Sequence, residues 1–446
     1  MIKQIDMESI GHFVHSNGNE TLTIVLRVAL TEEINTAHMQ TALEKAAQRY
    51  PNFHSVLASG GKGLVYELSN DKPVLQVGNK KRKLASDELH GFPYCVSCEG
   101  NMLKLSVHHG ITDGYGATEF IKTLLYYYLK ECGKPVTADE NIKLLETPYD
   151  EAAEEELSHL KYYDRDFKQG QPQFGKVKLF SLPVEFWDEA GKYEFKHFKL
   201  SMSVKQAAGF ARQCGSSVTA LINAVLCKAF QTAYDLEGKL LINSITSNFR
   251  RLLPSDTLHN FSGWFLSFYT PEMHGMSLAQ TAAVMKGMIT QNNTKQNAVK
   301  VLSERTAKGL KYREMPFDEI FADKPGNMME KKAVRQSLGG LITNVGALGV
   351  TESMQPWIED MELYIPAITA PIVFGVNSVG DALTVSVVQS FEDEDIVKAF
   401  CKVCDENGLD VTCRDMGIEV TDTLEKDSVK LLSYTSDCRQ TKLSLA

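Results

Sequence analysis

Apolar and polar residues alternate in short runs along the first third of the chain, and runs with a longer period separate them. Residues 20–30 (ETLTIVLRVAL) and 101–109 (NMLKLSVHH) have the period of two that is typical of a β-strand. Residues 35–51 and 117–133 have apolar positions at helical spacing, and Gly133 is a stop signal. Four shorter runs also predict strands: residues 54–59, 63–69, 72–78 and 93–98.

The second half of the chain repeats this alternation. Residues 216–236 predict a long buried helix that begins after a serine, and residues 277–311 predict a long polar helical region. Further strands are predicted over residues 193–202, 239–249, 263–273, 338–348 and 371–390, and further helices over residues 201–215 and 393–408. Hairpin-like strand pairs dominate, so the pattern favours an α+β fold of mixed sandwiches over a Rossmann fold.

An acidic and then glycine-containing stretch separates the two halves. We interpret residues 151–174 as a crossover between a first domain, residues 1–150, and a second domain, residues 175–446. The tail from about residue 410 has no assignment. A chain of 446 residues is long enough for two domains of ordinary size.

Composition narrows the class of protein. With 43 % hydrophobic and 23 % charged residues, the chain has the balance of a soluble globular protein. It carries 47 Lys and Arg against 56 Asp and Glu, a net charge of −9, which disfavours nucleic-acid binding. The N-terminus lacks the apolar region of a signal peptide, and no run is long enough to span a membrane. Nine cysteines at irregular spacing favour reduced thiols, so we expect a cytoplasmic protein.

One short segment carries the candidate chemistry: His108-His109-Gly110-Ile111-Thr112-Asp113-Gly114. It lies where a predicted strand ends, before a tight turn over residues 112–116 and a helix. Side chains of adjacent strand residues point to opposite faces, so only one of the two histidines can face a given cleft. We therefore expect one chemical and one structural histidine.

This segment resembles the HHxxxDG motif of the chloramphenicol acetyltransferase-like superfamily, which includes alcohol acyltransferases and the condensation domains of nonribosomal peptide synthetases. Three later segments are similar to condensation-domain patterns, in the same order, and the resemblance extends to about residue 407. They are Ser247-Asn248-Phe249-Arg250, Gly263-Trp264-Phe265-Leu266-Ser267 and Met315-Pro316-Phe317-Asp318-Glu319. The resemblance implies two such domains that form a V around a central tunnel.

The resemblance also implies roles for residues. His109 would be the general base that takes a proton from the acceptor, without a covalent acyl-enzyme. Asp113 would be structural and paired with Arg250, although Arg251 is an alternative partner. Ser267 is a candidate oxyanion donor, unless the strand register places Trp264 or Tyr269 inward instead. His108, Gly114 and Trp264 would border the substrate, with Gly114 leaving room for a pantetheine arm.

We therefore expect an acyltransferase that moves an acyl or acetyl group from acyl-CoA to an alcohol or amine. The donor is a co-substrate, and no permanent cofactor is expected. One alternative is a condensation-like enzyme that takes its thioester from a carrier protein acting in trans. Another is a non-catalytic binding module of the same fold. Two fused domains would build the site internally, which favours a monomer.

Other patterns have simpler explanations. The pairs Cys95/Cys98 and Cys401/Cys404 have zinc-like spacing, but the first lies in a strand and the second is about 300 residues away, so we expect no metal site. The basic run over residues 80–83 could meet the phosphates of coenzyme A, although a solvated loop is the simpler explanation. His12 and His15 are candidates for the acceptor side.

Overall fold

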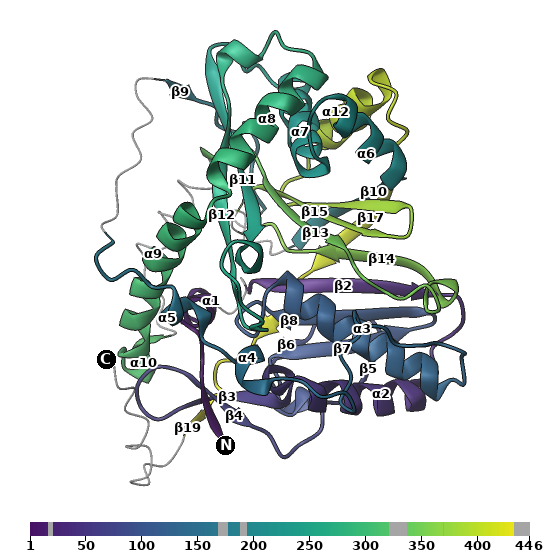
Figure 1. The fold of residues 1–446 in the computed structure, drawn as a ribbon, viewed down its shortest axis with the longest axis vertical. Coiled ribbons are helices and arrows are strands. Elements are labelled where there is room, and N and C mark those ends of the chain that lie inside the picture. The colour runs from purple at the N-terminus through teal and green to yellow at the C-terminus, as the bar shows by residue number, and fades with distance from the viewer. Residues whose placement is uncertain (17–20, 168–176, 188–193, 321–336, 369, 432–446) are drawn as a thin grey trace.

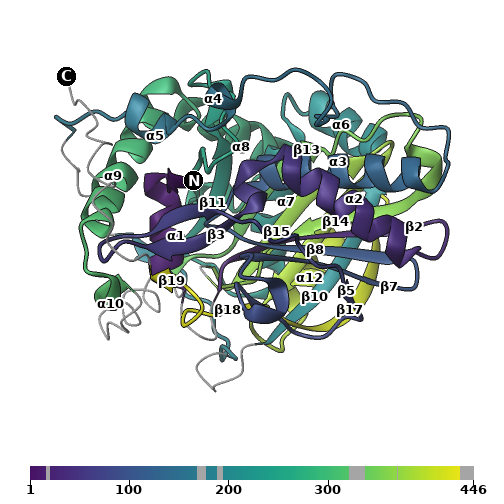
Figure 2. The ribbon, with the colours of Figure 1, turned by 90° about the horizontal axis from the view of Figure 1, so that it is seen from below.

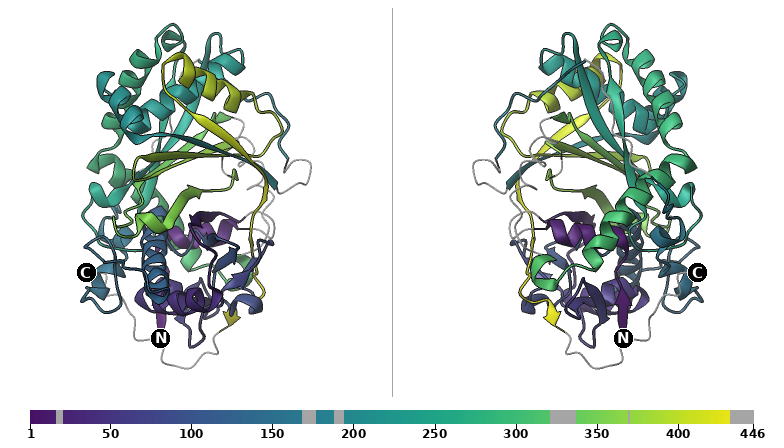
Figure 3. Two further views of the ribbon diagram at one scale, coloured as in Figure 1. Left: turned by 90° about the vertical axis from the view of Figure 1, so that its right-hand side faces the viewer. Right: turned by 90° about the vertical axis from the view of Figure 1, so that its left-hand side faces the viewer.

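The computed structural model describes residues 1–16, 21–167, 177–187, 194–320, 337–368 and 370–431. Figure 1 shows two layered halves, with the N-terminal elements below and most C-terminal elements above. Each half has helices on its outer side and a sheet on its inner side (Figures 1 and 3). The α+β fold class that the sequence predicts is confirmed.

The lower half is built on a five-stranded sheet in the order β14-β2-β8-β7-β5. Its strands are β2 (Thr23–Leu30), β5 (Gln76–Val77), β7 (Tyr94–Glu99), β8 (Met102–His108) and β14 (Ile358–Tyr364). Two helices cover its outer face, α2 (Thr36–Arg49) and α3 (Gly114–Glu131). All eight residues of β2 are buried, because helices pack on one side of the sheet and the upper half packs on the other.

The upper half is built on an eight-stranded sheet. Its main path runs β12-β11-β13-β15-β16-β10-β17, and its strands are β9 (Lys178–Leu179), β10 (Glu194–Ser203), β11 (Lys239–Asn248), β12 (Ser262–Tyr269), β13 (Leu341–Ala347), β15 (Ile372–Val379), β16 (Ala382–Gln389) and β17 (Thr412–Val420). Its outer helices are α6 (Val204–Gln213), α7 (Val218–Ala233), α8 (Leu278–Asn292) and α12 (Asp395–Glu406). Helix α7 lies at the centre of this core, as its mostly apolar sequence indicates.

The remaining elements join the two halves at one side. Helix α1 (Met7–His15) packs against α9 (Lys295–Arg313), and the crossover segment contributes α4 (Glu151–Glu154) and α5 (Ser158–Lys161). A four-stranded sheet β1-β4-β3-β19 lies at the lower edge. The other short elements are β1 (Ile2–Gln4), β3 (Ser55–Ser59), β4 (Val65–Leu68), β6 (Lys83–Leu84), β18 (Thr423–Leu424), β19 (Lys430–Leu431), α10 (Phe317–Ile320) and the 3₁₀ turns at residues 51–54, 87–89, 249–251, 271–273 and 355–357.

The chain does not divide into two halves at residue 175 as cleanly as the sequence suggests. Strand β14 belongs to the C-terminal part of the chain but pairs with β2, in register Ile358↔Leu30 to Tyr364↔Val25. The tail also returns to the lower half, where β18 pairs with β6 and β19 pairs with β3. The lower half is therefore completed by residues from beyond position 357.

Several predicted elements differ from the observed ones. The polar helical region is two helices, α8 and α9. The chain breaks after Asn292, and the side chain of Thr294 caps the start of α9 by accepting a hydrogen bond from the backbone N–H of Asn297. Helix α3 begins at Gly114, inside the segment expected to be a turn, because Asp113 caps it. The sequence pattern did not predict α1, β14 or β17. Strands β15 and β16 lie within residues 371–390, where strands were predicted, and they pair antiparallel.

Candidate active site

His108 ends strand β8 and is sealed inside the lower half. Its side chain is fully buried, and its ring stacks on Phe13 with 4.3 Å between centroids. The Nδ1 atom accepts a hydrogen bond from the backbone N–H of Gly110, and Nε2 lies 2.7 Å from the hydroxyl of Ser16. Burial lowers the pKa of His108 well below its ordinary value. His108 thus has the environment of a structural residue, and its burial gives no support to the expected contact with the substrate, which stays a prediction.

Glycines in this loop permit close approaches that a side chain would prevent. A Cβ atom at Gly110 would lie 2.4 Å from the ring of Phe13, and one at Gly116 would lie 2.0 Å from the hydroxyl of Thr112. At Gly114 a Cβ atom would lie 2.9 Å from Val345 of β13. The glycine at position 114 therefore lets α3 approach the upper half, and its expected contact with a pantetheine arm stays a prediction.

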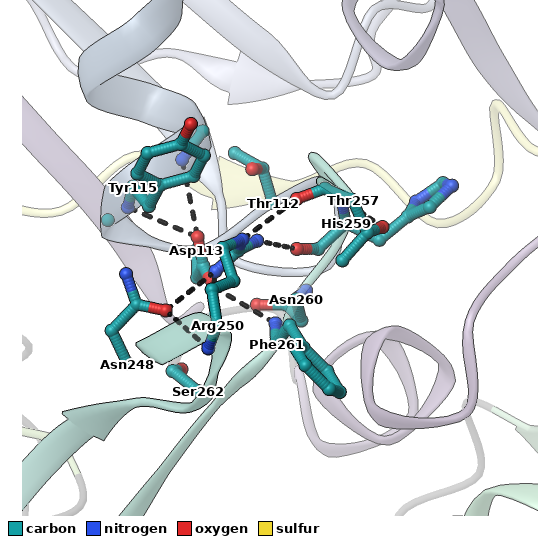
Figure 4. Close-up of polar contacts among 12 residues, drawn as sticks. Thr112, Asp113, Tyr115, Asn248, Arg250, Thr257, His259, Asn260, Phe261 and Ser262 are labelled. Atoms are coloured by element: carbon teal, nitrogen blue, oxygen red, sulfur yellow. Dashed lines mark hydrogen bonds and ion pairs between the residues drawn. The ribbon is translucent and has the colours of Figure 1, made fainter. Parts of the chain in front are cut away.

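Asp113 holds the turn and the start of α3. Its Oδ1 accepts hydrogen bonds from the backbone N–H groups of Tyr115 and Gly116, at 3.1 and 3.2 Å. Its Oδ2 accepts from Arg250, at 2.6 Å, and from the backbone N–H of Phe261, at 2.9 Å. These four bonds give the carboxylate of this buried side chain partners from both halves (Figure 4).

Arg250 extends the same clamp within the upper half. Besides Asp113, its guanidinium donates to the backbone carbonyls of Thr257 and His259, at 2.8 and 2.6 Å (Figure 4). Its side chain is 8 % exposed, whereas the neighbouring Arg251 is exposed. Of the two arginines that the sequence left open, the structure places Arg250 against Asp113. The segment of residues 257–261 is thereby pinned next to the His109 loop.

His109 lies where this segment meets the lower half, and it is partly exposed. Its Nδ1 is 2.9 Å from Oδ1 of Asn260, and its ring stacks on that of His12 with 4.4 Å between centroids. Burial, and after it the neighbouring His12, lowers the pKa of His109 to about 4. The imidazole is therefore uncharged at neutral pH and can accept a proton.

A charged cluster that no motif indicated lies beside His12. The carboxylate of Glu8 in α1 pairs with Arg305 of α9 and with Nε2 of His159, 3.0 Å away, and Nε2 of His12 lies 3.7 Å from it. Burial alone would raise the pKa of Glu8, but these cations and hydrogen-bond partners hold it well below its usual range. The proposed place of His12 near the site is thus supported by contact with His109, while Nε2 of His15 faces the hydroxyl of Tyr312.

Ser267 does not lie near His109. Its hydroxyl accepts a hydrogen bond from Asn223 of α7 at 2.8 Å and contacts the sulfur of Met285, inside the upper core. It is five residues beyond Ser262 on β12, roughly 17 Å along the strand. Tyr269 is buried on the same face, and Trp264, on the other face, is 48 % exposed. The oxyanion role expected for Ser267 therefore has no geometric support, and a substrate contact of Trp264 stays a prediction.

The basic run over residues 80–83 is partly paired with nearby carboxylates. Lys80 and Arg82 pair with Glu88, at 3.2 and 2.5 Å, and Lys83 pairs with Glu425, at 2.8 Å. Two carboxylates thus pair with three of the four cations of residues 80–83, so the run keeps an excess of positive charge and its contact with the phosphates of coenzyme A stays a prediction. Among the described residues there is no group of three or more His, Cys, Asp or Glu placed to hold a metal. Within the same ranges, every helix is too short or too polar to cross a membrane.

Comparison with known proteins gives similarity in structure but not in sequence. No protein-family model matches the chain, and no curated protein matches its sequence. Among solved structures, TRI101 of F. sporotrichioides, in complex with coenzyme A and T-2, has a TM-score of 0.59 at 10 % identity, and the match covers 93 % of this chain and 99 % of that one.

Two further structures show the range of similar proteins. TRI3 trichothecene 15-O-acetyltransferase from Fusarium sporotrichioides has a TM-score of 0.56 at 11 % identity, with 91 % of this chain and 94 % of that chain covered. The nonribosomal peptide synthetase FmoA3 has a TM-score of 0.55 at 10 % identity, and the match covers 92 % of this chain but 42 % of the synthetase. At such identities the similarity establishes the fold and leaves activity open.

Proposed function

Because the chain has the chloramphenicol acetyltransferase-like fold, we propose that it is an acyltransferase that moves an acyl or acetyl group from acyl-CoA to an alcohol or amine. One observation carries the proposal. The uncharged imidazole of His109 lies where the two halves meet, on a loop that Asp113 and Arg250 clamp in place. Direct attack of an alcohol or amine on a thioester requires a neutral base held in position to take the proton of the attacking group.

The proposed reaction needs no covalent enzyme intermediate. Nε2 of His109 takes the proton from the hydroxyl or amino group as that group attacks the thioester carbon. The tetrahedral intermediate then collapses, the carbon–sulfur bond breaks, and the thiolate leaves. The protonated His109 returns its proton to this thiolate, so the ring ends the cycle neutral.

Coenzyme A as donor is supported by the complexes of similar structures, and a passage between the halves would bring donor and acceptor to His109 from opposite sides. The similarity to nonribosomal peptide synthetases supports a second candidate donor, a thioester on a carrier protein. The two donors share the reactive group and the phosphopantetheine arm. They differ in what carries the arm, a nucleotide in coenzyme A and a whole protein domain in the carrier. Assays with each donor in turn can therefore distinguish them.

The test is transfer by the purified protein. Acetyl-CoA and longer acyl-CoA thioesters are mixed with a panel of alcohols and amines, and both free thiol and acylated product are measured. We expect product with at least one pair. The variant His109→Ala should lose about 10²–10⁴-fold in turnover with little change in melting temperature. His274→Ala, a histidine of the upper half outside the site, should retain turnover.

The alternatives give different results in the same assay. Product from a carrier-bound thioester alone would assign the donor to a carrier protein. Absence of product with every donor, together with tight binding of another protein, would favour a non-catalytic module. Full turnover by His109→Ala would refute the proposed base.

A further inference from the structure

We propose that Asn260 is a positioning residue that decides which ring nitrogen of His109 carries the proton. The inference rests on the proposed function in one respect, namely that Nε2 of His109 is the base. A neutral imidazole has one N–H and one bare nitrogen, and only the bare nitrogen can accept a proton. The environment of Nδ1 therefore decides whether the catalytic nitrogen is usable.

Asn260 contacts His109 at two points. Its Nδ2 donates a hydrogen bond to the backbone carbonyl of His109, at 2.7 Å, and its Oδ1 lies 2.9 Å from Nδ1 of the same residue. A backbone carbonyl can only accept, so the amide nitrogen has to face it. The amide oxygen then faces Nδ1, and because this oxygen can only accept, Nδ1 has to carry the proton. The lone pair consequently lies on Nε2.

A second contact fixes the amide of Asn260 in this orientation. Its Nδ2 also donates to the hydroxyl of Ser9, at 2.7 Å, and this hydroxyl donates in turn to the carboxylate of Asp6. The same carboxylate accepts from the backbone N–H of Ser9 at the start of α1. Asp6, Ser9 and Asn260 are each at most 1 % exposed. Each bond in this buried chain therefore has a fixed direction from Asn260 to Asp6.

The adjacent His108 has the opposite arrangement. Its Nδ1 accepts from the backbone N–H of Gly110 at 2.9 Å, so its proton lies on Nε2, next to Ser16. The two neighbouring rings thus hold opposite tautomers, and His108 is an internal reference for any measurement on His109.

Asn260 and His109 come from different halves of the molecule. Asn260 precedes β12 of the upper half, and its backbone neighbours are pinned by Arg250 and Asp113 (Figure 4). His109 follows β8 of the lower half, and Ser9 lies on α1. The base therefore acquires its tautomer only when all three segments are assembled.

The test uses the full chain labelled with ¹⁵N-histidine, whose nitrogen chemical shifts distinguish N–H from bare ring nitrogens. In the wild type we expect Nδ1–H for His109 and Nε2–H for His108. In Asn260→Ala, Nδ1 of His109 loses its side-chain acceptor and keeps only the backbone carbonyl of His109 itself, so its signal should move toward that of a bare nitrogen while the His108 signals stay. Retention of Nδ1–H in this variant would overturn the inference.

A conservative variant separates positioning from a general loss of structure. Asn260→Asp keeps an oxygen that accepts from Nδ1, so the tautomer of His109 should be retained. The added negative charge should also raise the pKa of His109. The other titratable or charged groups facing this ring are His12 and Glu8 of α1, His108 of β8 and Asp113 of the loop, and all are unchanged. Loss of the tautomer in both variants alike would contradict the proposal.

The matched control is Asn52→Ala. Asn52 is also a buried asparagine, and its Nδ2 lies 3.2 Å from a ring nitrogen of another histidine, His259. This variant should leave the signals of His109 unchanged, and a change equal to that of Asn260→Ala would count against a specific role.

Turnover completes the test. Asn260→Ala should lose about 10²-fold or more in kcat, as expected for a base in the wrong tautomer, with KM changed less than about threefold. An unchanged kcat would overturn the inference. A wild-type protein that transfers no acyl group refutes the proposed function instead, and the nitrogen spectra, which need no substrate, still decide the role of Asn260.

Discussion

At the scale of single residues, the fold gives two adjacent histidines different tasks. The ring of His108 is enclosed between Phe13 and Ser16, whereas the ring of His109 is partly exposed and stacks on His12. Both rings are uncharged at neutral pH because burial opposes a positive charge. Of the two, His109 lies where the halves meet, which is why we propose it as the base.

The low pKa of His109 predicts the pH dependence of acyl transfer. The base acts in its neutral form, and its pKa in the free protein is about 4. We expect kcat/KM to stay level from pH 8 down to about pH 5, to reach half its value near pH 4, and to fall by about tenfold per pH unit below that. Initial rates at donor concentrations well below KM, with circular dichroism at each pH to exclude unfolding, measure this. A midpoint near the ordinary histidine value of about 6.5 would contradict the burial argument.

The motif residues could be predicted from sequence because their chemistry is local. His109, Asp113 and the glycines lie within seven positions, and the resemblance of the later segments leads to Arg250. Ser9, His12 and Asn260 could not be predicted as a set, because Asn260 lies about 250 residues from the other two, which lie about 100 residues from His109, and none has a characteristic neighbour. The expected role of Ser267 lacks support for a different reason: alternation along β12 indicates which residues share a face but not which face meets the lower half, and Ser267 contacts Asn223 of α7.

At the scale of elements, one ion pair joins the start of α3 to the segment that leads into β12. Asp113 caps α3, and Arg250 donates to the backbone carbonyls of residues 257 and 259. Each residue therefore stabilises the segment next to it, and the ion pair connects the two segments. The Asp-Gly at the start of α3 is typical of a turn, which is why the sequence pattern placed the helix start too late. The same aspartate is also a helix N-cap, because its Oδ1 accepts from the backbone N–H groups of Tyr115 and Gly116, while Arg250 binds its other oxygen.

This arrangement predicts unequal effects for two adjacent arginines. Arg250→Ala leaves the buried carboxylate of Asp113 without its partner and should cost about 3–5 kcal/mol in free energy of unfolding. Turnover should fall as well, because the His109 loop loses its support. Arg251→Ala removes an exposed charge and should change stability by less than about 0.5 kcal/mol. Urea unfolding of both variants measures the difference, and equal effects would contradict the clamp.

At the scale of the whole molecule, strands from the C-terminal part of the chain complete the lower half. Leu424 of β18 is 4 % exposed and packs in a core with Phe13, Leu84 and Ile320. Phe13 is also the residue on which His108 stacks, so this core supports the active-site loop. The tail, which had no assignment from sequence, thus packs in the core that supports the candidate site.

A pair of adjacent substitutions tests the role of the tail. Leu424→Ala should lower the free energy of unfolding by about 2–5 kcal/mol, because it leaves a cavity in this core. Glu425→Ala removes only a surface ion pair with Lys83 and should cost less than about 1 kcal/mol. Thermal and urea unfolding of the two variants provide the measurement. If Leu424→Ala were no more destabilising than its neighbour, the tail would not be packed as described.

The pairing of β14 with β2 has a consequence during synthesis. Until Tyr364 has left the ribosome, β14 cannot pair with β2, so one edge of β2 stays open in the nascent chain. This edge has unpaired backbone groups and apolar side chains that can pair with another molecule. Strand partners so distant along the chain meet slowly. We therefore expect translation of this protein to pass through a long aggregation-prone interval, during which chaperones that shield nascent chains should determine its yield.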